Sequence, residues 1–234
     1  MALKKLSRGQ WLVVLGIALV VIDQVIKVLI KLNFPLGGQI RIFEWFRLLF
    51  VENEGMAFGM KFGGWVGKLL LSLFRIGLSG LLIWWINKLL KKGDTPVGVL
   101  IGLTLITAGA IGNLIDCMFY GLIFSESSFA AVAHLGDGYA PFLFGKVVDM
   151  FYFPLIDTVW PSWVPFFGGR PLRFFEPVFN FADSCVTVGA FYLILFQYRF
   201  FSKDDSASAS KDGGVASARD GGEAASKKSA RNGK

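Results

Sequence analysis

Two aspartates in apolar surroundings are the residues of this sequence best suited to chemistry. Asp149 lies in the segment VVDM (147–150), and Asp183 lies in NFADS (180–184). Two carboxylates held close together cannot both ionise near neutral pH, so one proton is shared between them. The ionised carboxylate can then take a proton from water while the protonated one polarises a carbonyl group. Taken alone, Asp183 is explained equally well as a cap at a helix N-terminus, and the spacing does not show whether the two residues meet.

Other ionisable residues lie inside apolar stretches, where a charge without a partner is costly in a membrane. Asp23 and Lys27 are four residues apart, so they share one face of a helix and can pair directly. Such an internal ion pair explains them at least as well as catalysis does. Arg75 lies near the middle of another apolar stretch, and we expect it to face the interior and to pair with a carboxylate, Asp23 being one candidate.

The segment GAIGNLID (109–116) combines small residues with an amide and a carboxylate. Gly109 and Gly112 predict a close contact between two helices, because small residues let helix backbones approach each other in a membrane. Asn113 can donate or accept a hydrogen bond inside that contact, and Asp116 follows at the end of the helix.

The composition places these residues in a membrane protein. Of the 234 residues, 54% are hydrophobic and 18% are charged, whereas an average chain has about 25% charged residues. The mean hydropathy is +0.56. The formal net charge of +7 comes with so little polar surface that it fits a membrane surface better than a nucleic acid.

Four stretches are long and apolar enough to cross a bilayer core of about 30 Å as helices. They cover about 11–30, 65–86, 97–115 and 179–198. Loosely alternating residues around Arg41–Phe46, in the first of the two long loops (about 31–64 and 116–178), predict short strands at the interface. We therefore expect an all-α membrane protein: a four-transmembrane-helix bundle with a small interfacial β segment on the periplasmic side. Residues 1–202 form the membrane domain in this prediction, and 203–234 form a disordered cytoplasmic tail.

Basic residues next to the spans predict the orientation. Clusters of Lys and Arg precede the first span, fill the turn between the second and third, and follow the fourth, whereas those in the long loops are scattered. Both termini are therefore predicted to be cytoplasmic. The basic start and the apolar run 11–22 imitate a secretory signal, but no small-residue cleavage site follows, so we expect an uncleaved first span.

Five short motifs occur in order along these spans. They are DQVIK (23–27), NEGMAFG (53–59), GNLID (112–116), VVD (147–149) and FNFADS (179–184). Each string is weak alone, but five in order on a four-span chain form a specific pattern. By this pattern, from about Trp11 to Phe201, the chain resembles the bacterial lipoprotein signal peptidases, the membrane aspartyl peptidases called signal peptidase II.

The resemblance implies that Asp149 and Asp183 are the catalytic dyad of an aspartyl endopeptidase. It implies that eight further residues shape the site, namely Asp23, Lys27, Asn53, Gly55, Asn113, Asp116, Asn180 and Ala182. The implied substrate is a prolipoprotein whose Cys carries diacylglycerol, cut on the amino side of that Cys without metal, nucleotide or other cofactor. The implied location is the bacterial inner membrane, with the site near the periplasmic face. Prolipoprotein and membrane lipid are then the partners of a monomer, and no nucleic acid is expected.

Two features depart from the family pattern. Cys117 stands where family members usually have Arg, so a guanidinium must come from elsewhere, with Arg75 as a candidate, or is not needed. The segment 117–146 is much longer than the short connection typical of the family, which predicts a lid over the site or a surface for a partner.

Rival interpretations rest on single strings. GLSG (77–80) matches the Gly-x-Ser-Gly of rhomboid serine proteases, but a serine nucleophile needs a base, and the one histidine, His134, lies in a loop. One histidine also cannot supply a three-histidine or His-Glu-x-x-His zinc site. Cys117 and Cys185 are expected as two buried free thiols rather than a disulfide. The non-enzyme alternative is a small membrane transporter or channel, because charges inside a membrane also mark ion pathways.

Overall fold

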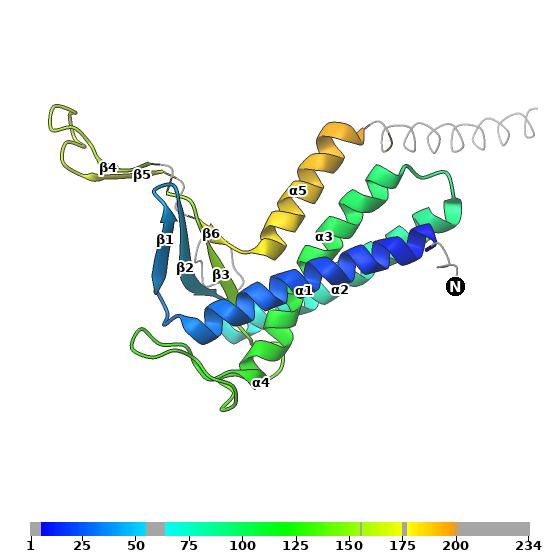
Figure 1. Cartoon of the computed structure of the whole chain (residues 1–234), viewed down its shortest axis with the longest axis horizontal. Coiled ribbons are helices and arrows are strands. Elements are labelled where there is room, and N and C mark those ends of the chain that lie inside the picture. The colour runs from blue at the N-terminus through cyan, green and yellow to red at the C-terminus, as the bar shows by residue number, and fades with distance from the viewer. Residues whose placement is uncertain (1–5, 55–63, 155, 175–176, 199, 201–234) are drawn as a thin grey trace, which may run out of the picture. The chain divides into compact units, whose positions relative to one another are not determined.

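The computed structural model describes residues 6–54, 64–154, 156–174, 177–198 and 200 of the chain (Figure 1). Residues up to Ala190 form one compact unit that contains the whole candidate site. The predicted tail, 203–234, lies outside the described residues. The helices are α1 (Arg8–Asn33), α2 (Gly64–Lys92), α3 (Val97–Ile115), the π-helix η2 (Asp116–Tyr120), α4 (Gly121–Ile123) and α5 (Phe181–Phe196).

Three helices of the described chain are long and apolar enough to cross a membrane. They are α1, α2 and the stretch Val97–Ile123, in which α3 continues through η2 and α4. The fourth predicted span, about 179–198, corresponds to α5, whose 16 residues rise about 24 Å, less than a bilayer core of about 30 Å. Three spans are therefore confirmed, and the count of four stays a prediction.

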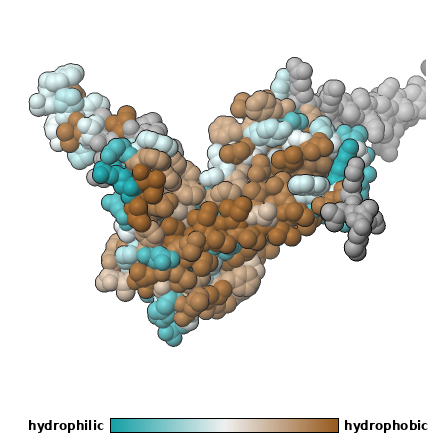
Figure 2. All heavy atoms as spheres, in the orientation of Figure 1, coloured by the Kyte–Doolittle hydropathy of each residue, from teal (hydrophilic) through white to brown (hydrophobic). Residues whose placement is uncertain are grey.

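α1 and α2 each pack against α3. Their outward sides carry exposed apolar residues, such as Val13 and Ile17 on α1 and Leu81 on α2. Figure 2 shows this as a broad hydrophobic surface along the helices, with hydrophilic residues gathered toward their ends. Such a surface is stable only where lipid replaces water, because apolar side chains avoid water.

A small antiparallel sheet follows the end of α1. Its strands are β1 (Gln39–Phe43), β2 (Phe46–Asn53), β3 (Val147–Tyr152) and β6 (Val178–Phe179), in the order β1-β2-β3-β6. A separate hairpin joins β4 (Ile156–Val159) and β5 (Pro171–Phe174). The strands predicted around Arg41–Phe46 are confirmed, but the sheet is larger than predicted because it also takes in β3 and β6 from the second long loop.

The alternation of side chains along β3 separates the face that packs on the apolar cluster from the face that carries Asp149. Val148 and Met150 are fully buried in an apolar cluster with Ile30 of α1 and Phe50 of β2. Asp149 lies between them in sequence and therefore points to the other face of the sheet. The apolar cluster fixes the strand that carries one of the two candidate catalytic residues.

Candidate functional site

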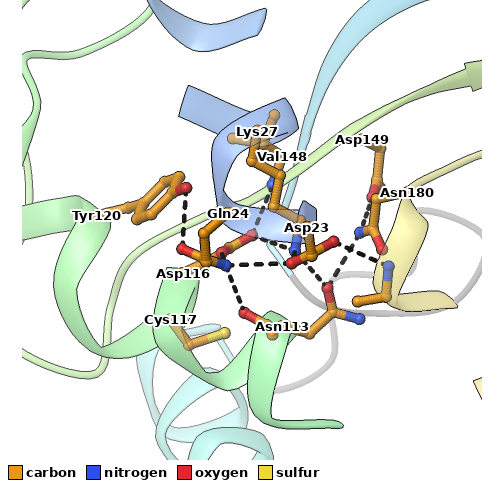
Figure 3. Close-up of polar contacts among 12 residues, drawn as sticks. Asp23, Gln24, Lys27, Asn113, Asp116, Cys117, Tyr120, Val148, Asp149 and Asn180 are labelled. Atoms are coloured by element: carbon orange, nitrogen blue, oxygen red, sulfur yellow. Dashed lines mark hydrogen bonds and ion pairs between the residues drawn. The ribbon is translucent and has the colours of Figure 1, made fainter. Parts of the chain in front are cut away.

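Figure 3 shows Asp23, Lys27, Asn113, Asp116, Asp149 and Asn180 close together. The predicted site residues come from separate elements of the fold. They are Asp23 and Lys27 on α1, Asn113 on α3, Asp116 on η2, Asn53 on β2, Asp149 on β3, and Asn180, Ala182 and Asp183 at the start of α5. Gly55 was also predicted to shape the site, and it lies outside the described residues.

Lys27 lies at the centre of a buried charge cluster. Its Nζ is 2.9 Å from Asp23 Oδ2 and 2.8 Å from Asp116 Oδ2, and all three side chains are at most 2% exposed. The predicted pairing of Asp23 with Lys27 is therefore confirmed. Because a charge buried away from water is stable only with a partner, each member of the cluster depends on the other two.

Gln24 and Tyr120 complete the hydrogen bonding of this cluster, although neither was predicted as a site residue. Gln24 Nε2 donates to Asp116 Oδ1 at 2.9 Å and to Asp23 Oδ2 at 3.1 Å. The Tyr120 hydroxyl donates to Gln24 Oε1 at 3.2 Å. Gln24 stands beside Asp23 in the motif DQVIK, which was the signal available for it.

The two carboxylates of the cluster also hold backbone from distant parts of the chain. Asp23 Oδ1 accepts the N–H of Ala182 at 2.8 Å, and Asp116 Oδ2 accepts the N–H of Val148 at 3.2 Å. Each of these donors is the residue immediately before a candidate catalytic aspartate. The charge cluster therefore fixes the backbone from which both aspartates project.

Two glycines of α3 let the start of α5 come this close. A Cβ on Gly109 would overlap the carbonyl oxygen of Ala182. A Cβ on Gly112 would lie 2.6 Å from Asp23 Oδ2 and 3.1 Å from Ala182 Cβ. The prediction that these glycines allow a close helix contact is confirmed, and the contact brings Ala182 to the charge cluster.

Asn113 connects Lys27 to Asp183. Its Oδ1 accepts hydrogen bonds from Lys27 Nζ at 2.8 Å and from Asn180 Nδ2 at 3.0 Å. Since both donors occupy the oxygen side of the amide, the nitrogen side faces Asp183, and Nδ2 donates to Asp183 Oδ1 at 2.8 Å. The buried lysine thereby orients a donor toward the Asp183 carboxylate.

Asn180 hydrogen-bonds to both candidate catalytic residues. Its Nδ2 donates to Asp149 Oδ1 at 2.7 Å, and its Oδ1 accepts the backbone N–H of Asp183 at 2.8 Å. Its own N–H donates to Asp183 Oδ2 at 3.3 Å. The reciprocal bonds with Asp183 form a capping box at the start of α5, so the cap interpretation of Asp183 is correct. The same residue binds Asp149, so the fold brings the two aspartates to one place.

The Asp149 carboxyl is suited to acid–base chemistry at neutral pH. It is only 3% exposed. Burial raises the pKa of Asp149 to about 7, and the charge of Asp183 acts in the same direction. Hydrogen bonds from Asn180 and Asn53 and the charge of Lys27 oppose this rise in the pKa. A pKa in this range lets the carboxyl both hold and release a proton near neutral pH.

Arg75 lies beside the residue that departs from the family pattern. Its Nη1 is 2.9 Å from Cys117 Sγ. The structure pairs Asp23 with Lys27 and places Arg75 beside Cys117, and the expected carboxylate partner of Arg75 stays a prediction. A guanidinium thus reaches position 117 from α2. Cys117 and Cys185 are both buried free thiols.

A second buried lysine, Lys31, was missed by the sequence analysis. Its Nζ pairs with Glu52 of β2, donates to Ser127 Oγ at 2.8 Å and lies 5.1 Å from the centre of the Tyr139 ring. Lys31 follows Lys27 by four residues, as Lys27 follows Asp23, so the three share one face of the helix. This spacing was the signal in the sequence from which a second buried lysine could have been predicted. These contacts fix the long segment 117–146 to α1 and to the sheet.

The rhomboid-like string GLSG has no catalytic partner in the part of the chain that the structure describes. Ser79 is buried in α2, and its hydroxyl has no hydrogen-bond partner there. His134 is exposed, and its Nδ1 lies 3.2 Å from the carbonyl oxygen of Leu135. The string therefore does not indicate a serine protease. Close packing of its glycines does not explain it either, because no atom of the described residues lies within 4 Å of a Cβ placed on Gly77 or Gly80.

Comparisons with known proteins identify the family of the chain. The family model described as Signal peptidase (SPase) II matches residues 15–199. The lipoprotein signal peptidase of Porphyromonas gingivalis is 48% identical over 195 residues, which cover 82% of this chain and 85% of that protein. The lipoprotein signal peptidase of Amoebophilus asiaticus is 38% identical over 77% of this chain and 75% of its own length. A solved bacterial membrane enzyme is 20% identical and matches with a TM-score of 0.53, over 82% of this chain and 90% of that one, which shows a shared fold.

Proposed function

The chain belongs to the signal peptidase II family, and we propose that Asp149 and Asp183 are the catalytic dyad with which it cleaves prolipoproteins. Family membership makes it a lipoprotein signal peptidase, which is a protease of the membrane. The proposed substrate carries diacylglycerol on the Cys that follows the signal peptide, and the cut falls on the amino side of that Cys. No cofactor takes part in the proposed reaction.

The contacts of Asn180 are the observation that supports the dyad most strongly. One amide side chain bonds to Asp149 at 2.7 Å and, through both its backbone and its Oδ1, to Asp183. Asp149 and Asp183 are 34 positions apart in the sequence, and a capping residue without a site would need no second carboxylate. The raised pKa of Asp149, partly caused by Asp183, supports the same assignment.

Asp183 is the base in the proposed mechanism, and Asp149 is the acid. The raised pKa of Asp149 favours its protonated form, which suits the acid, and Asn113 Nδ2 holds the Asp183 carboxyl in place by donating to its Oδ1. Asp183 takes a proton from water as the water oxygen bonds to the scissile carbonyl carbon, and Asp149 gives its proton to the carbonyl oxygen. When the C–N bond breaks, Asp183 returns its proton to the leaving amine. Asp149 recovers a proton as the carbonyl forms again.

A row of aromatic rings on the sheet supports a lipidated substrate. Neighbouring ring centroids in this row are 4.9–6.1 Å apart, and its members are Phe43, Trp45, Phe46, Phe153, Phe151 and Phe179. Phe179 directly precedes Asn180, and Phe151 lies two residues from Asp149 on the same face of β3. Aromatic surface beside the dyad fits an apolar segment with a lipidated Cys.

We propose that α5 completes a fourth crossing of the bacterial inner membrane. Both termini then lie in the cytoplasm, the dyad lies near the periplasmic face, and residues 1–202 form a monomeric peptidase domain. The basic end of α2, with Lys88, Lys91 and Lys92, supports this orientation. Lys88 lies 5.2 Å from the Trp84 ring, as expected of residues at a membrane surface.

Conservative substitutions of the dyad test the function. Asp149→Asn and Asp183→Asn keep the size of each side chain, and each is expected to lower the rate of prolipoprotein cleavage by about 10²–10⁴-fold or more. The matched control is Asp137→Asn, which changes an exposed aspartate of the segment 117–146. Cleavage of a diacylglyceryl prolipoprotein is followed in detergent, with thermal unfolding as the check of folding. If both variants fold and still mature the substrate, the dyad is wrong, whereas a transporter would show changed flux with processing intact.

A further inference from the structure

An apolar groove lies between α1 and α2, in the half of the helices that points away from the sheet. Its volume is about 820 Å³. Because α1 and α2 each pack against α3, α3 forms the floor of the groove between them. Val13 and Ile17 of α1 and Ile86 of α2 are among the side chains that line it.

The polar atoms in the floor of the groove are already bonded. Thr104 Oγ1 donates to the carbonyl oxygen of Leu100 at 2.8 Å, and Thr107 Oγ1 donates to that of Leu103 at 2.7 Å. Both bonds run back along α3, so the threonines offer no free hydroxyl hydrogen to an occupant. The floor of the groove therefore fits a hydrocarbon chain, and the other polar side chains that line the groove are Gln10 and Asn87.

A smaller hollow with a partly polar lining lies beside the groove at the ends of the helices. Its volume is about 280 Å³, and Ser7, Arg8 and Thr95 contribute its polar lining. Gly9 and Leu90 line both spaces, so the two are neighbours at these residues. A partly polar hollow beside a long apolar groove matches the two parts of an amphiphile, a headgroup and a tail.

The charges around the hollow select the sign of the headgroup. The described residues at this end include four cations, Arg8, Lys88, Lys91 and Lys92, against the single carboxylate of Asp94. Cations attract anionic lipids, and the attraction is worth about fivefold in affinity for each Lys or Arg. The signal peptide of a substrate begins with basic residues, which these cations would repel. Charge therefore favours lipid over substrate as the occupant.

We propose that the groove and the hollow bind one anionic phospholipid from the leaflet that surrounds the beginning of α1. An acyl chain lies in the groove, and the phosphate lies in the hollow beside Arg8, with Lys91 in the adjoining last turn of α2 as a second cation. The groove extends along α1 to Val21 and along α3 to Ile111, which both come just before residues of the charge cluster and the amide network. The bound chain thus fills the space between α1 and α2 beneath the site and stabilises their packing on α3.

Native mass spectrometry of the full-length protein in neutral detergent tests this lipid site. Phosphatidylglycerol and phosphatidylcholine with identical acyl chains are the two probes. One phosphatidylglycerol is expected to bind tightly, and Arg8→Gln with Lys91→Gln is expected to weaken it by about 25-fold, toward the affinity of phosphatidylcholine. Arg41→Gln with Arg170→Gln removes two exposed cations outside the hollow and is the matched control.

A second variant tests the junction without changing any charge. A Cβ at position 9 would already contact Leu90 Cδ1 at 3.6 Å, so the larger side chain of Gly9→Phe must displace Leu90 and enter the two spaces that both residues line. It is expected to lower the affinity for phosphatidylglycerol at least tenfold while prolipoprotein cleavage in neutral detergent, assayed in parallel, shows that the protein is folded. Equal binding of the two lipids, or unchanged binding in Gly9→Phe, overturns the proposal. It is also overturned if a photo-cross-linker at Val13 labels a prolipoprotein signal peptide instead of lipid.

Discussion

Lys27 and Lys31 are buried lysines one turn apart on the same apolar helix, yet their surroundings differ in kind. Both ammonium side chains are fully buried. Lys27 is bonded to two carboxylates and to the amide of Asn113, all at 2.8–2.9 Å. From Asn113 the hydrogen bonds continue to Asp183, so the partners of Lys27 lead to the candidate dyad.

The partners of Lys31 lead away from the dyad. They are Glu52 of β2, Ser127 of the segment 117–146, and the aromatic rings of Phe50, Phe124 and Tyr139. Lys146 joins from the other end of the same segment, with its Nζ 3.4 Å from Glu52 Oε2. These contacts hold the two ends of the segment against the sheet, so they oppose the opening that a lid would require.

The difference shows that burial of a charge does not by itself mark a functional residue. Both lysines lose the hydration of their charge on burial, and both stand next to apolar residues in the sequence of α1. The role of each lysine depends on the element that supplies its partners. Asn113 of α3 bonds to both Lys27 and Asp183, whereas Ser127 of the segment 117–146 bonds to Lys31 and Glu52. Lys27 is therefore assigned to positioning the dyad, and Lys31 to fixing an insertion.

Loss of the Lys27 ammonium is expected to have the largest effect. Lys27→Met leaves Asp23 and Asp116 buried without their cation, which costs about 3–5 kcal/mol in the free energy of unfolding. Cleavage should fall below detection, because both backbone N–H groups held by these carboxylates lose their fixed position. Thermal unfolding in detergent and a prolipoprotein cleavage assay measure the two effects. A folded, active Lys27→Met protein would remove the distinction between the lysines.

Loss of the Lys31 ammonium is expected to be milder. Lys31→Met should cost about 2 kcal/mol, since Glu52 keeps Lys146 and Ser127 as partners. Cleavage should stay within about threefold of the wild-type rate, because no bond of the dyad is lost. Limited proteolysis is the sharper measurement, and cuts should appear within 117–146. A loss of activity as large as that of Lys27→Met, in a folded protein, would contradict the assignment.

A pair of glycine substitutions sharpens the comparison at the level of packing. Gly112→Ala places a methyl group 2.6 Å from Asp23 Oδ2, and we expect a loss of about 1–2 kcal/mol with reduced cleavage. Gly80→Ala is the matched control, because nothing lies within 4 Å of a Cβ at that exposed position of α2. There the better helix propensity of Ala should leave stability equal or raise it by about 0.5–1 kcal/mol. Equal effects of the two changes, in thermal unfolding, would contradict the close contact at Gly112.

The smallest predicted effect is a shift in the pH dependence of cleavage. Activity needs a protonated Asp149, so the rate should fall as the pH rises through about 7, the raised pKa of this carboxyl. Asn180→Ala removes a hydrogen bond that lowers this pKa, so the falling limb should move to higher pH by less than about one unit. Lys31→Met should leave the limb in place. Cleavage rates of the Asn180→Ala and Lys31→Met variants, measured from pH 5 to 9, test this difference. A falling limb that moves to lower pH in Asn180→Ala would show that Asp149 is not the acid.

Much of the helical architecture could be predicted because it depends on local pattern. The span 97–115 agrees with α3, and the span 11–30 lies within α1, since long apolar runs in lipid must satisfy their backbone hydrogen bonds as helices. The cap at the start of α5 was equally local, because Asn180 and Asp183 have the spacing of a capping box. β3 was not predicted, because a short apolar run is equally compatible with a strand and with buried loop.

By itself the sequence determined that this is a membrane protein, which residues are charged inside apolar stretches, and that Asp23 pairs with Lys27 one turn away. Only the tertiary structure decided that Asp149 and Asp183 share Asn180, that Lys27 leads to them, and that Lys31 does not. The reason is physical. Pairing along a helix follows from its pitch, whereas contacts between α3, β3 and α5 depend on how closely backbones approach, which Gly109 and Gly112 permit.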